Sequence, residues 1–212
     1  MKADSSEMSP EYWNEACRAL ARRDPVLKQL VKAYPGITLR SRGDAFQTLS
    51  RAIVGQQISV KAADSVWQRF VETVERVEPK SVLRVRAPRL RSAGLSNRKV
   101  EYLRDLARHF HEGLIEERRW PAMSDDEIIT DLVRVKGIGR WSAEMFLIFY
   151  LMRPDVLPLD DVGLQRAVAW HYNDAEPLSR GEIQKIGASW RPWSTVATWY
   201  LWRSLEPIPV EY

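Results

Sequence analysis

A short glycine turn late in the chain has the residue types of a phosphate-binding device. Gly137-Ile138-Gly139 lies between two segments of helical hydrophobic spacing, and Lys136 and Arg140 flank it as cations. The glycines permit a tight turn and leave the amides at the start of the second helix bare, so a phosphate oxygen can approach them. Such a turn can hold a nucleic-acid backbone without reading its sequence. The alternative is a helix pair that only needs Gly at a C-cap.

Two adjacent carboxylates follow this turn at a spacing that could place them near a bound phosphate backbone. Asp160 and Asp161 end a Pro-bounded loop and precede a helical segment that begins near Val162. An Asp at a helix start is most often an N-cap, and we expect one of the pair to be one. The other carboxylate is a candidate for catalysis.

The composition permits a nucleic-acid partner but does not demonstrate one. The 212 residues include 32 Lys and Arg against 28 Asp and Glu, a formal net charge of +4. The single Cys17 excludes an internal disulfide and any Cys-based zinc or iron–sulfur site. The longest apolar stretch, around Met145 to Met152, is too short to span a bilayer, and the N-terminus lacks a signal-peptide apolar region. We expect no membrane partner and a cytoplasmic, nucleoid-associated protein, or a nuclear one in a eukaryote.

Almost every segment has the hydrophobic spacing of a helix. Capping residues or first-turn prolines mark the helix starts, at Ser9-Pro10, Asp24-Pro25, Asp44, Ser59, Ser96, Ser124, Ser179 and Pro192. Two of these starts, Ser124 with Glu127 and Ser179 with Glu182, have the spacing of a capping box. No alternating strand pattern of useful length occurs. The sequence therefore predicts an all-α protein with many short helices.

Four separated blocks of the chain resemble a known family. The hairpin KGIGRWSAEM followed by LPLDDVGLQR resembles the helix–hairpin–helix (HhH-GPD) DNA glycosylase superfamily, with its Gly/Pro-rich loop and catalytic Asp. RAIVGQQISVKAA, GLSNRKVEYLRDLA and WRPWSTVATWYLW are similar to its alkylbase branch, 3-methyladenine DNA glycosylase II. The resemblance covers about residues 44–202. We expect these 212 residues not to include the extra N-terminal β-domain of longer bacterial enzymes.

The resemblance implies two helical lobes with the active-site cleft between them. One lobe is expected to span residues 44–156 and to contain the helix–hairpin–helix motif. The other is expected to combine residues 1–43 with residues 157–212, so that the N- and C-terminal helices pack together.

The resemblance also assigns the chemistry to one of the two aspartates. Asp161 matches the catalytic residue, and Asp160 is then expected to be the structural cap. Asp161 would stay ionised, stabilise the oxocarbenium-like sugar and orient or deprotonate the attacking water. Lyase-competent relatives carry a Lys at the position of Trp141, so the resemblance implies a monofunctional glycosylase without lyase activity.

Aromatic side chains are expected to line the base pocket. Trp141 and Trp202 match pocket positions of the family, where a cationic alkylated purine gains about 0.5–2 kcal/mol per aromatic face. Met145 stands one helical turn after Trp141, where the nearest relatives are expected to carry an aromatic, and this leaves the substrate range open. The alternative reading of these Trp residues is that they belong to the core.

Further DNA contacts are expected from the loop that contains Gln56 and Gln57. This loop matches the family's DNA-inserting loop, and Gln57 sits at the wedge position that fills the space of a flipped base. The alternative for Gln57 is a solvated turn residue. The basic run from Arg84 to Arg98 could also touch DNA, although a solvated face explains it nearly as well.

The sequence thus predicts a DNA glycosylase that flips out and hydrolytically excises alkylated purines of the 3-methyladenine and 7-methylguanine type from double-stranded DNA in base excision repair. We expect a monomer without a cofactor, leaving open a monovalent cation at the hairpin. Two alternatives are a glycosylase for deaminated or oxidised bases and a non-catalytic helix–hairpin–helix protein that binds DNA lesions. The sequence does not rank 3-methyladenine, 7-methylguanine, hypoxanthine and ethenoadenine as substrates.

Overall fold

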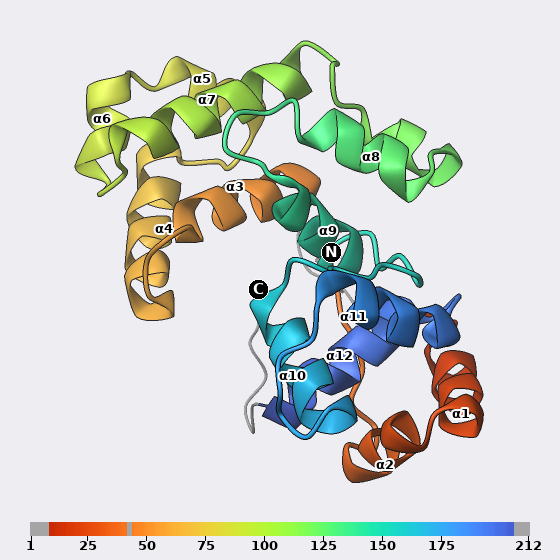
Figure 1. The fold of residues 1–212 in the computed structure, drawn as a ribbon. Helices are drawn as coiled ribbons and strands as arrows, with labels where there is room; N and C mark the ends of the chain where they lie inside the picture. The colour runs from red at the N-terminus through yellow and green to blue at the C-terminus, as the bar shows by residue number, and fades with distance from the viewer. Residues whose placement is uncertain (1–8, 42–43, 206–212) are drawn as a thin grey trace. The chain divides into compact units, whose positions relative to one another are not determined.

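The protein is helical throughout the part of the chain that the structure describes. The computed structural model describes residues 9–41 and 44–205, which form α-helices and two short 3-10 helices without a β-strand (Figure 1). The predicted all-α class is confirmed. Within the same ranges, no helix combines the length and the apolar character that crossing a membrane requires.

The chain divides into two compact units. The central unit comprises Arg42–Phe146, and the terminal unit comprises Met1–Ser41 together with Leu147–Tyr212. The predicted lobes differ from these units chiefly at residues 147–156, which belong to the terminal unit. Hydrogen bonds explain the difference, because Ser41 Oγ donates to the Tyr150 carbonyl and the Tyr12 hydroxyl donates to the Met152 carbonyl.

The central unit is built around helix α7, Asn97–His111, whose bounds match the predicted helix. Leu103 and Leu106 of α7 are fully buried, and helices α3 and α5 pack along it (Figure 1). The remaining elements of this unit are α3 (Ala45–Gly55), α4 (Val60–Val74), α5 (Pro79–Arg84), α6 (Ala87–Ser92), η1 (Glu117–Ala122), α8 (Asp125–Leu132) and most of α9 (Arg140–Phe149).

Local capping defines where the central helices begin. The side chains of Asp44, Ser59 and Ser96 accept hydrogen bonds from the backbone N–H groups of the first turns of α3, α4 and α7. Ser124 and Glu127 form the predicted capping box at the start of α8. Each of these bonds satisfies an N–H group that the helix itself leaves without an acceptor.

The terminal unit is organised by helix α12, Ser194–Leu205, whose first eight residues are all buried. Helices α1 (Trp13–Arg23), α2 (Pro25–Ala33) and α10 (Val162–Tyr172) pack against α12, and α11 (Arg180–Gly187) continues into η2 (Ala188–Trp190). Two predicted starts are displaced. Helix α1 begins at Trp13 after a turn in which the Trp13 N–H donates to the Pro10 carbonyl, and α12 begins two residues after Pro192.

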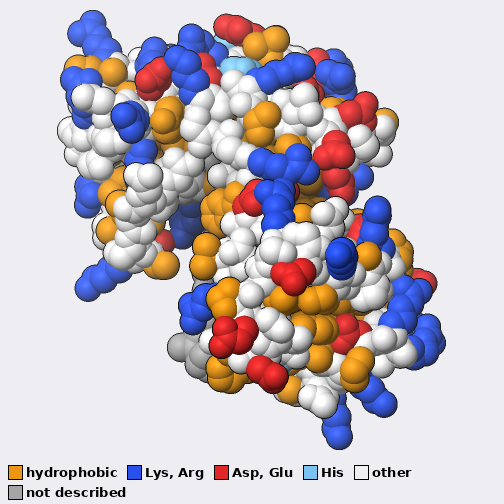
Figure 2. Space-filling model, viewed as in Figure 1, with side chains coloured by type: hydrophobic (Ala, Val, Ile, Leu, Met, Phe, Trp, Pro, Cys, Tyr) orange, Lys and Arg blue, Asp and Glu red, His pale blue; other side chains and the backbone are white. Residues whose placement is uncertain are grey.

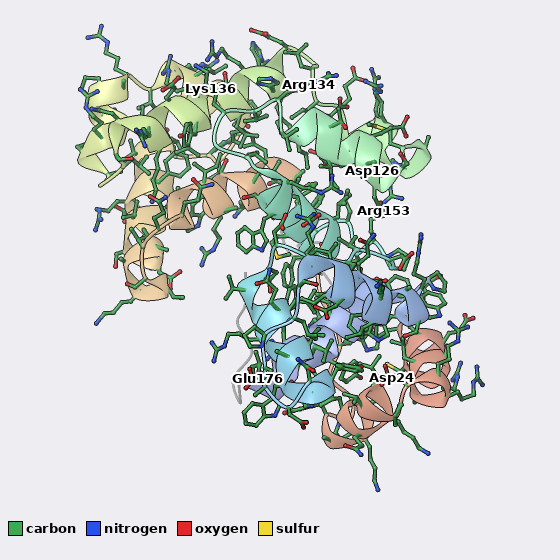
Figure 3. All side chains as sticks on the ribbon, viewed as in Figure 1. Asp24, Asp126, Arg134, Lys136, Arg153 and Glu176 are labelled. Atoms are coloured by element: carbon green, nitrogen blue, oxygen red, sulfur yellow. The ribbon has the colours of Figure 1, made fainter. Side chains whose placement is uncertain are left out.

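Asp24 is the polar anchor of the terminal unit (Figure 3). Its side chain is 7% exposed, and Oδ1 accepts hydrogen bonds from the N–H groups of Val26 and Leu27 at the start of α2. Oδ2 accepts from the Tyr172 hydroxyl at 2.7 Å and from Trp190 Nε1 at 3.1 Å. One carboxylate therefore joins α2, α10 and η2, and burial with the neighbouring Asp24 raises the pKa of Tyr172.

Asp24→Ala is expected to destabilise the protein by about 3 kcal/mol or more, because it leaves four donors without their acceptor in a buried place. Tyr172→Phe removes one of these donors and keeps the ring, so it should cost less, about 1.5 kcal/mol for one hydrogen bond to a charged group. Urea unfolding monitored by tryptophan fluorescence measures both. Equal losses for the two variants would contradict the role of Asp24 as an anchor.

Candidate functional site

The glycine turn adopts the geometry of a helix–hairpin–helix. Helix α8 ends at Leu132 and α9 begins at Arg140, and between them Gly137 has φ +85°, a conformation that favours glycine. The Ile138 N–H donates to the Val135 carbonyl at 3.1 Å, and the Ala143 N–H donates to the Gly139 carbonyl at 3.0 Å. Gly139 is exposed, so no side chain at this residue covers the first amides of α9.

Three side chains from α3–α4 and α7 hold the turn in place. Gln56 Nε2 donates to the Gly137 carbonyl at 2.8 Å, and Asp105 Oδ2 accepts from the Lys136 N–H at 2.9 Å. The ring of Tyr102 lies against Gly137, where an added Cβ would come within 2.2 Å of Tyr102 Cδ2. Gly137 is therefore required twice, by its backbone angle and by this ring.

Sequence reasoning missed Tyr102 and Asp105. Both lie in the block Gly94–Ala107, which carried part of the family resemblance, but nothing local in that block connects them to a turn more than thirty residues later. Asp105 is 7% exposed, and a buried carboxylate among apolar residues is the one signal that could have pointed to a long-range partner.

The two cations that flank the turn are engaged by carboxylates of the central unit. Lys136 Nζ lies 2.5 Å from Glu101 Oε1, and this contact raises the pKa of Lys136. Arg140 Nε donates to Glu144 Oε1 at 3.0 Å, and its Nη2 lies 3.3 Å from Asp126 Oδ1. Each cation is thus paired with an acid in this structure, and the expectation that both reinforce phosphate binding stays a prediction.

The loop after α3 places its two glutamines differently. Gln56 is half-buried and directs its amide at the hairpin, so it acts as a support of the turn. Gln57 is exposed and has φ +59°, an unusual backbone angle for a side chain of this size. The following Ile58 is 40% exposed and Val60 is 71% exposed. The insertion of Gln57 into DNA stays a prediction.

Asp161 caps helix α10 and is the centre of a second group of residues. Its Oδ1 accepts hydrogen bonds from the Leu164 N–H at 2.7 Å and from Trp202 Nε1 at 2.8 Å, and the residue is 9% exposed. The expectation that Asp160 is the cap is wrong. Asp160 is exposed and pairs with Arg180 of α11, whereas the extended backbone at Asp161 (φ −80°, ψ 118°) turns its carboxylate onto the helix.

Trp202 is held on its face as well as at its nitrogen. Its ring stacks on Phe149 with centroids 5.7 Å apart and an interplanar angle of 11°. Gly163 leaves room for this arrangement, because a Cβ there would lie 3.1 Å from Asp161 Oδ1 and 3.2 Å from Trp202 Cδ1. We refer to Asp161, Leu164, Trp202 and Phe149 as the Asp161 cluster. Phe149 was not predicted, because stacking leaves no local sequence signal.

Trp141 and Met145 lie one turn apart on α9. Trp141 is 41% exposed, so its assignment to the core is wrong, whereas Met145 is 8% exposed and belongs to the packed part of the helix. An exposed indole on the first turn after the hairpin offers an aromatic face to a ligand.

The Asp161 cluster can supply an anionic group of fixed orientation. Two N–H donors hold one carboxylate oxygen, so the group needs no reorganisation when positive charge develops nearby. Within residues 9–41 and 44–205, no group of His, Cys, Asp or Glu side chains is arranged to hold a metal ion.

Comparison with known proteins identifies the family. The model of the HhH-GPD superfamily of base excision DNA repair proteins matches residues 50–192, which include the hairpin and Asp161. The chain belongs to this superfamily. It is 30% identical to DNA-3-methyladenine glycosylase 1 of Schizosaccharomyces pombe over 182 residues, covering 84% of this chain and 80% of that one. It spans 66% and 65% of the lengths of two Bacillus subtilis relatives that it also matches.

Solved structures agree with this assignment. A DNA-3-methyladenine glycosidase from Bacillus halodurans superposes with a TM-score of 0.85 at 34% identity, covering 93% of this chain and 91% of that one. The S. pombe 3-methyladenine DNA glycosylase Mag1, solved in complex with abasic DNA, superposes with a TM-score of 0.76 at 30% identity, covering 90% and 96%.

The two glycines of the hairpin are expected to respond differently to the same substitution. Gly137→Ala places a methyl group in the Tyr102 ring at an unfavourable φ and should cost about 2 kcal/mol or more. Gly139→Ala meets nothing within 4 Å and should be neutral or stabilise by up to about 1 kcal/mol. Urea unfolding of the two variants measures the difference. A similar loss at both positions would show that the turn is not held as described.

Proposed function

We propose that this protein is a monofunctional DNA glycosylase that hydrolyses the N-glycosidic bond of alkylated purines in double-stranded DNA and leaves an abasic site. The observation that carries the proposal is the Asp161 carboxylate, buried and oriented by the Leu164 N–H and Trp202 Nε1. It supports catalysis because the resemblance places the family's catalytic Asp at this position, inside the region that the superfamily model matches. The naming of the relatives as DNA-3-methyladenine glycosylases supports the choice of substrate.

The chemistry follows from the leaving group. An N3- or N7-alkylated purine is cationic and leaves readily, so the enzyme has to expose the base and stabilise the sugar as the bond breaks. Asp161 acts as the anion that stabilises the oxocarbenium-like sugar, and it orients or deprotonates the attacking water. The purine departs as a neutral base with the electron pair of the C1′–N bond, and the water then forms the new bond at C1′ and loses its proton to Asp161 or to solvent.

Exposed aromatic rings support the preference for alkylated bases. Trp141 is 41% exposed, and Trp202 is half-buried with Phe149 stacked on it. A cationic base gains more from such faces than a neutral one does.

The residues also support the absence of lyase chemistry. A lyase needs an amine that attacks C1′ and forms a Schiff base. Trp141 occupies the position at which the resemblance places that amine, and an indole nitrogen cannot form a Schiff base. We therefore propose that the product strand remains unbroken. We further propose that the protein works as a cytoplasmic or nuclear monomer and without a cofactor.

Asp161→Asn is expected to fold normally and to release alkylated purine at least about a hundredfold more slowly than the wild type. Asn is as good an N-cap as Asp, and its oxygen can still accept from Leu164 and Trp202, so the change removes the charge and little else. Single-turnover release of 7-methylguanine from a duplex with one lesion, at saturating protein, measures the rate. Asp160→Asn is the matched control and should keep the wild-type rate.

The same reactions report on strand cleavage. Wild-type product should break only after heating in alkali, and borohydride should trap no covalent complex. Near-normal base release by Asp161→Asn would contradict the catalytic assignment. A trapped complex would contradict the monofunctional assignment alone. No base release by the wild type from alkylated, deaminated or oxidised substrates would favour a lesion-binding protein without catalysis.

A further inference from the structure

The positive charge of the chain is concentrated in one short segment. Residues 79–100 contain seven Lys and Arg and no Asp or Glu, although the whole chain carries a net charge of only +4. The rest of the chain is therefore net negative. Figure 2 shows Lys and Arg side chains gathered over the part of the central unit that contains α5 and α6.

Six of these seven cations are available to a partner. They are exposed, and their side chains make no hydrogen bond or ion pair with any residue in 9–41 or 44–205. We call them the basic surface: Lys80, Arg84, Arg86, Arg89, Arg91 and Arg98. Other exposed cations in the part of the chain that the structure describes are also unpaired, and what sets this group apart is that it lies in a segment without a single Asp or Glu.

The backbone beneath the basic surface is firmly held. Val82 of α5 and Leu90 of α6 are fully buried, and α5 packs along α7. Arg104 of α7 donates to the Val85 carbonyl at 2.9 Å, and Arg69 of α4 donates to the Ala93 carbonyl at 2.9 Å. Two arginines are thus used to fix the segment, while those of the basic surface point to solvent.

The hairpin has the opposite electrostatic character. Lys136 is paired with Glu101, and Arg140 is paired with Glu144 and Asp126. The hairpin therefore offers backbone amides to a phosphate but few unneutralised cations. The long-range attraction of this unit for a polyanion has to come largely from elsewhere, and the basic surface is the group with the required charge.

We propose that the basic surface is a second, sequence-independent binding site for the phosphate backbone of undamaged duplex DNA. The choice of DNA as the polyanion rests on the proposed function. Five of the six side chains are Arg, whose planar fork suits phosphate oxygens. No large exposed apolar side chain lies within residues 79–100, which disfavours a protein partner, and the lack of an exposed aromatic disfavours stacking of single strands.

The site has a specific consequence for binding to undamaged DNA. Each phosphate contact contributes about 0.9 to the slope of log K against log salt concentration. A variant that lacks three cations should therefore show a slope smaller by about 2.7 and an affinity at 50 mM salt lower on the order of tenfold. Base release from a lesion duplex at saturating protein should be unaffected, because no residue of the basic surface belongs to the Asp161 cluster.

The experiment compares Arg86→Gln/Arg89→Gln/Arg91→Gln with the wild type by fluorescence anisotropy of a labelled, undamaged 20-base-pair duplex in KCl from 50 to 200 mM. Arg22→Gln/Lys28→Gln/Lys32→Gln removes the same charge from exposed positions of α1 and α2 and should retain at least half of the affinity. Arg86→Lys/Arg89→Lys/Arg91→Lys keeps the charge and should bind within about threefold of the wild type. Thermal unfolding verifies that all three variants fold.

An unchanged affinity of the Gln variant, or an equal loss in the α1–α2 control, would overturn the proposal. The proposal would also be overturned if the Gln variant lost affinity only for single-stranded RNA or for polyglutamate, measured in the same assay. Single-turnover release of 7-methylguanine at saturating protein separates this proposal from the proposed function. If the wild-type protein binds duplex DNA through the basic surface but releases no base, the proposed binding site is supported and the glycosylase assignment is contradicted.

Discussion

One hydrogen-bonded carboxylate, that of Asp161, joins α10 to α12 and is the contact on which the rest of the candidate site depends. It begins α10 through the Leu164 N–H and reaches α12 through Trp202 Nε1. Trp202 then stacks on Phe149 at the end of α9, and Gly163 keeps the space between the indole and the carboxylate open. These contacts fix the orientation of the carboxylate in advance. A carboxylate in water is surrounded by a hydration shell that has to reorganise before the carboxylate can stabilise a developing cation.

The central unit solves a different problem, which is to present backbone amides instead of a charge. Gln56, Tyr102 and Asp105 contact the turn and fix its position. The flanking cations, Lys136 and Arg140, form ion pairs with acidic side chains. Under the proposed function, binding by amides suits a protein that has to accept any DNA sequence around a lesion. The cations of the basic surface lie on α5, on α6 and at its N-cap, and at the start of α7. In the proposed arrangement, docking by backbone amides and attraction by charge are carried by different residues of the central unit.

Structural features that depend on residues close together in the sequence were predictable. Those that depend on a partner far away in the sequence were not. The bounds of α7 and both capping boxes were predictable, because a cap and its N–H group lie three residues apart. The cap was assigned to Asp160 instead of Asp161, since neighbouring residues of the same type differ only in their backbone angles and tertiary partners. Tyr102 and Phe149 escaped detection because an apolar ring serves the core and a site equally well. The catalytic role of Asp161 and the pocket position of Trp202 were expected from the family resemblance alone. The structure adds the hydrogen bond between the two side chains.

The most direct test of the account is the single-turnover rate of Trp202→Phe with a duplex that contains one 7-methylguanine. Phe can keep the stacking on Phe149, and the Leu164 N–H still caps with Asp161, so the change removes chiefly the indole donor. A hydrogen bond to a charged group is worth about 1.5–3 kcal/mol, so release should slow by about ten- to a hundredfold at saturating protein while the fold is retained. A rate within twofold of the wild type would contradict the claim that Trp202 positions the carboxylate that does the chemistry.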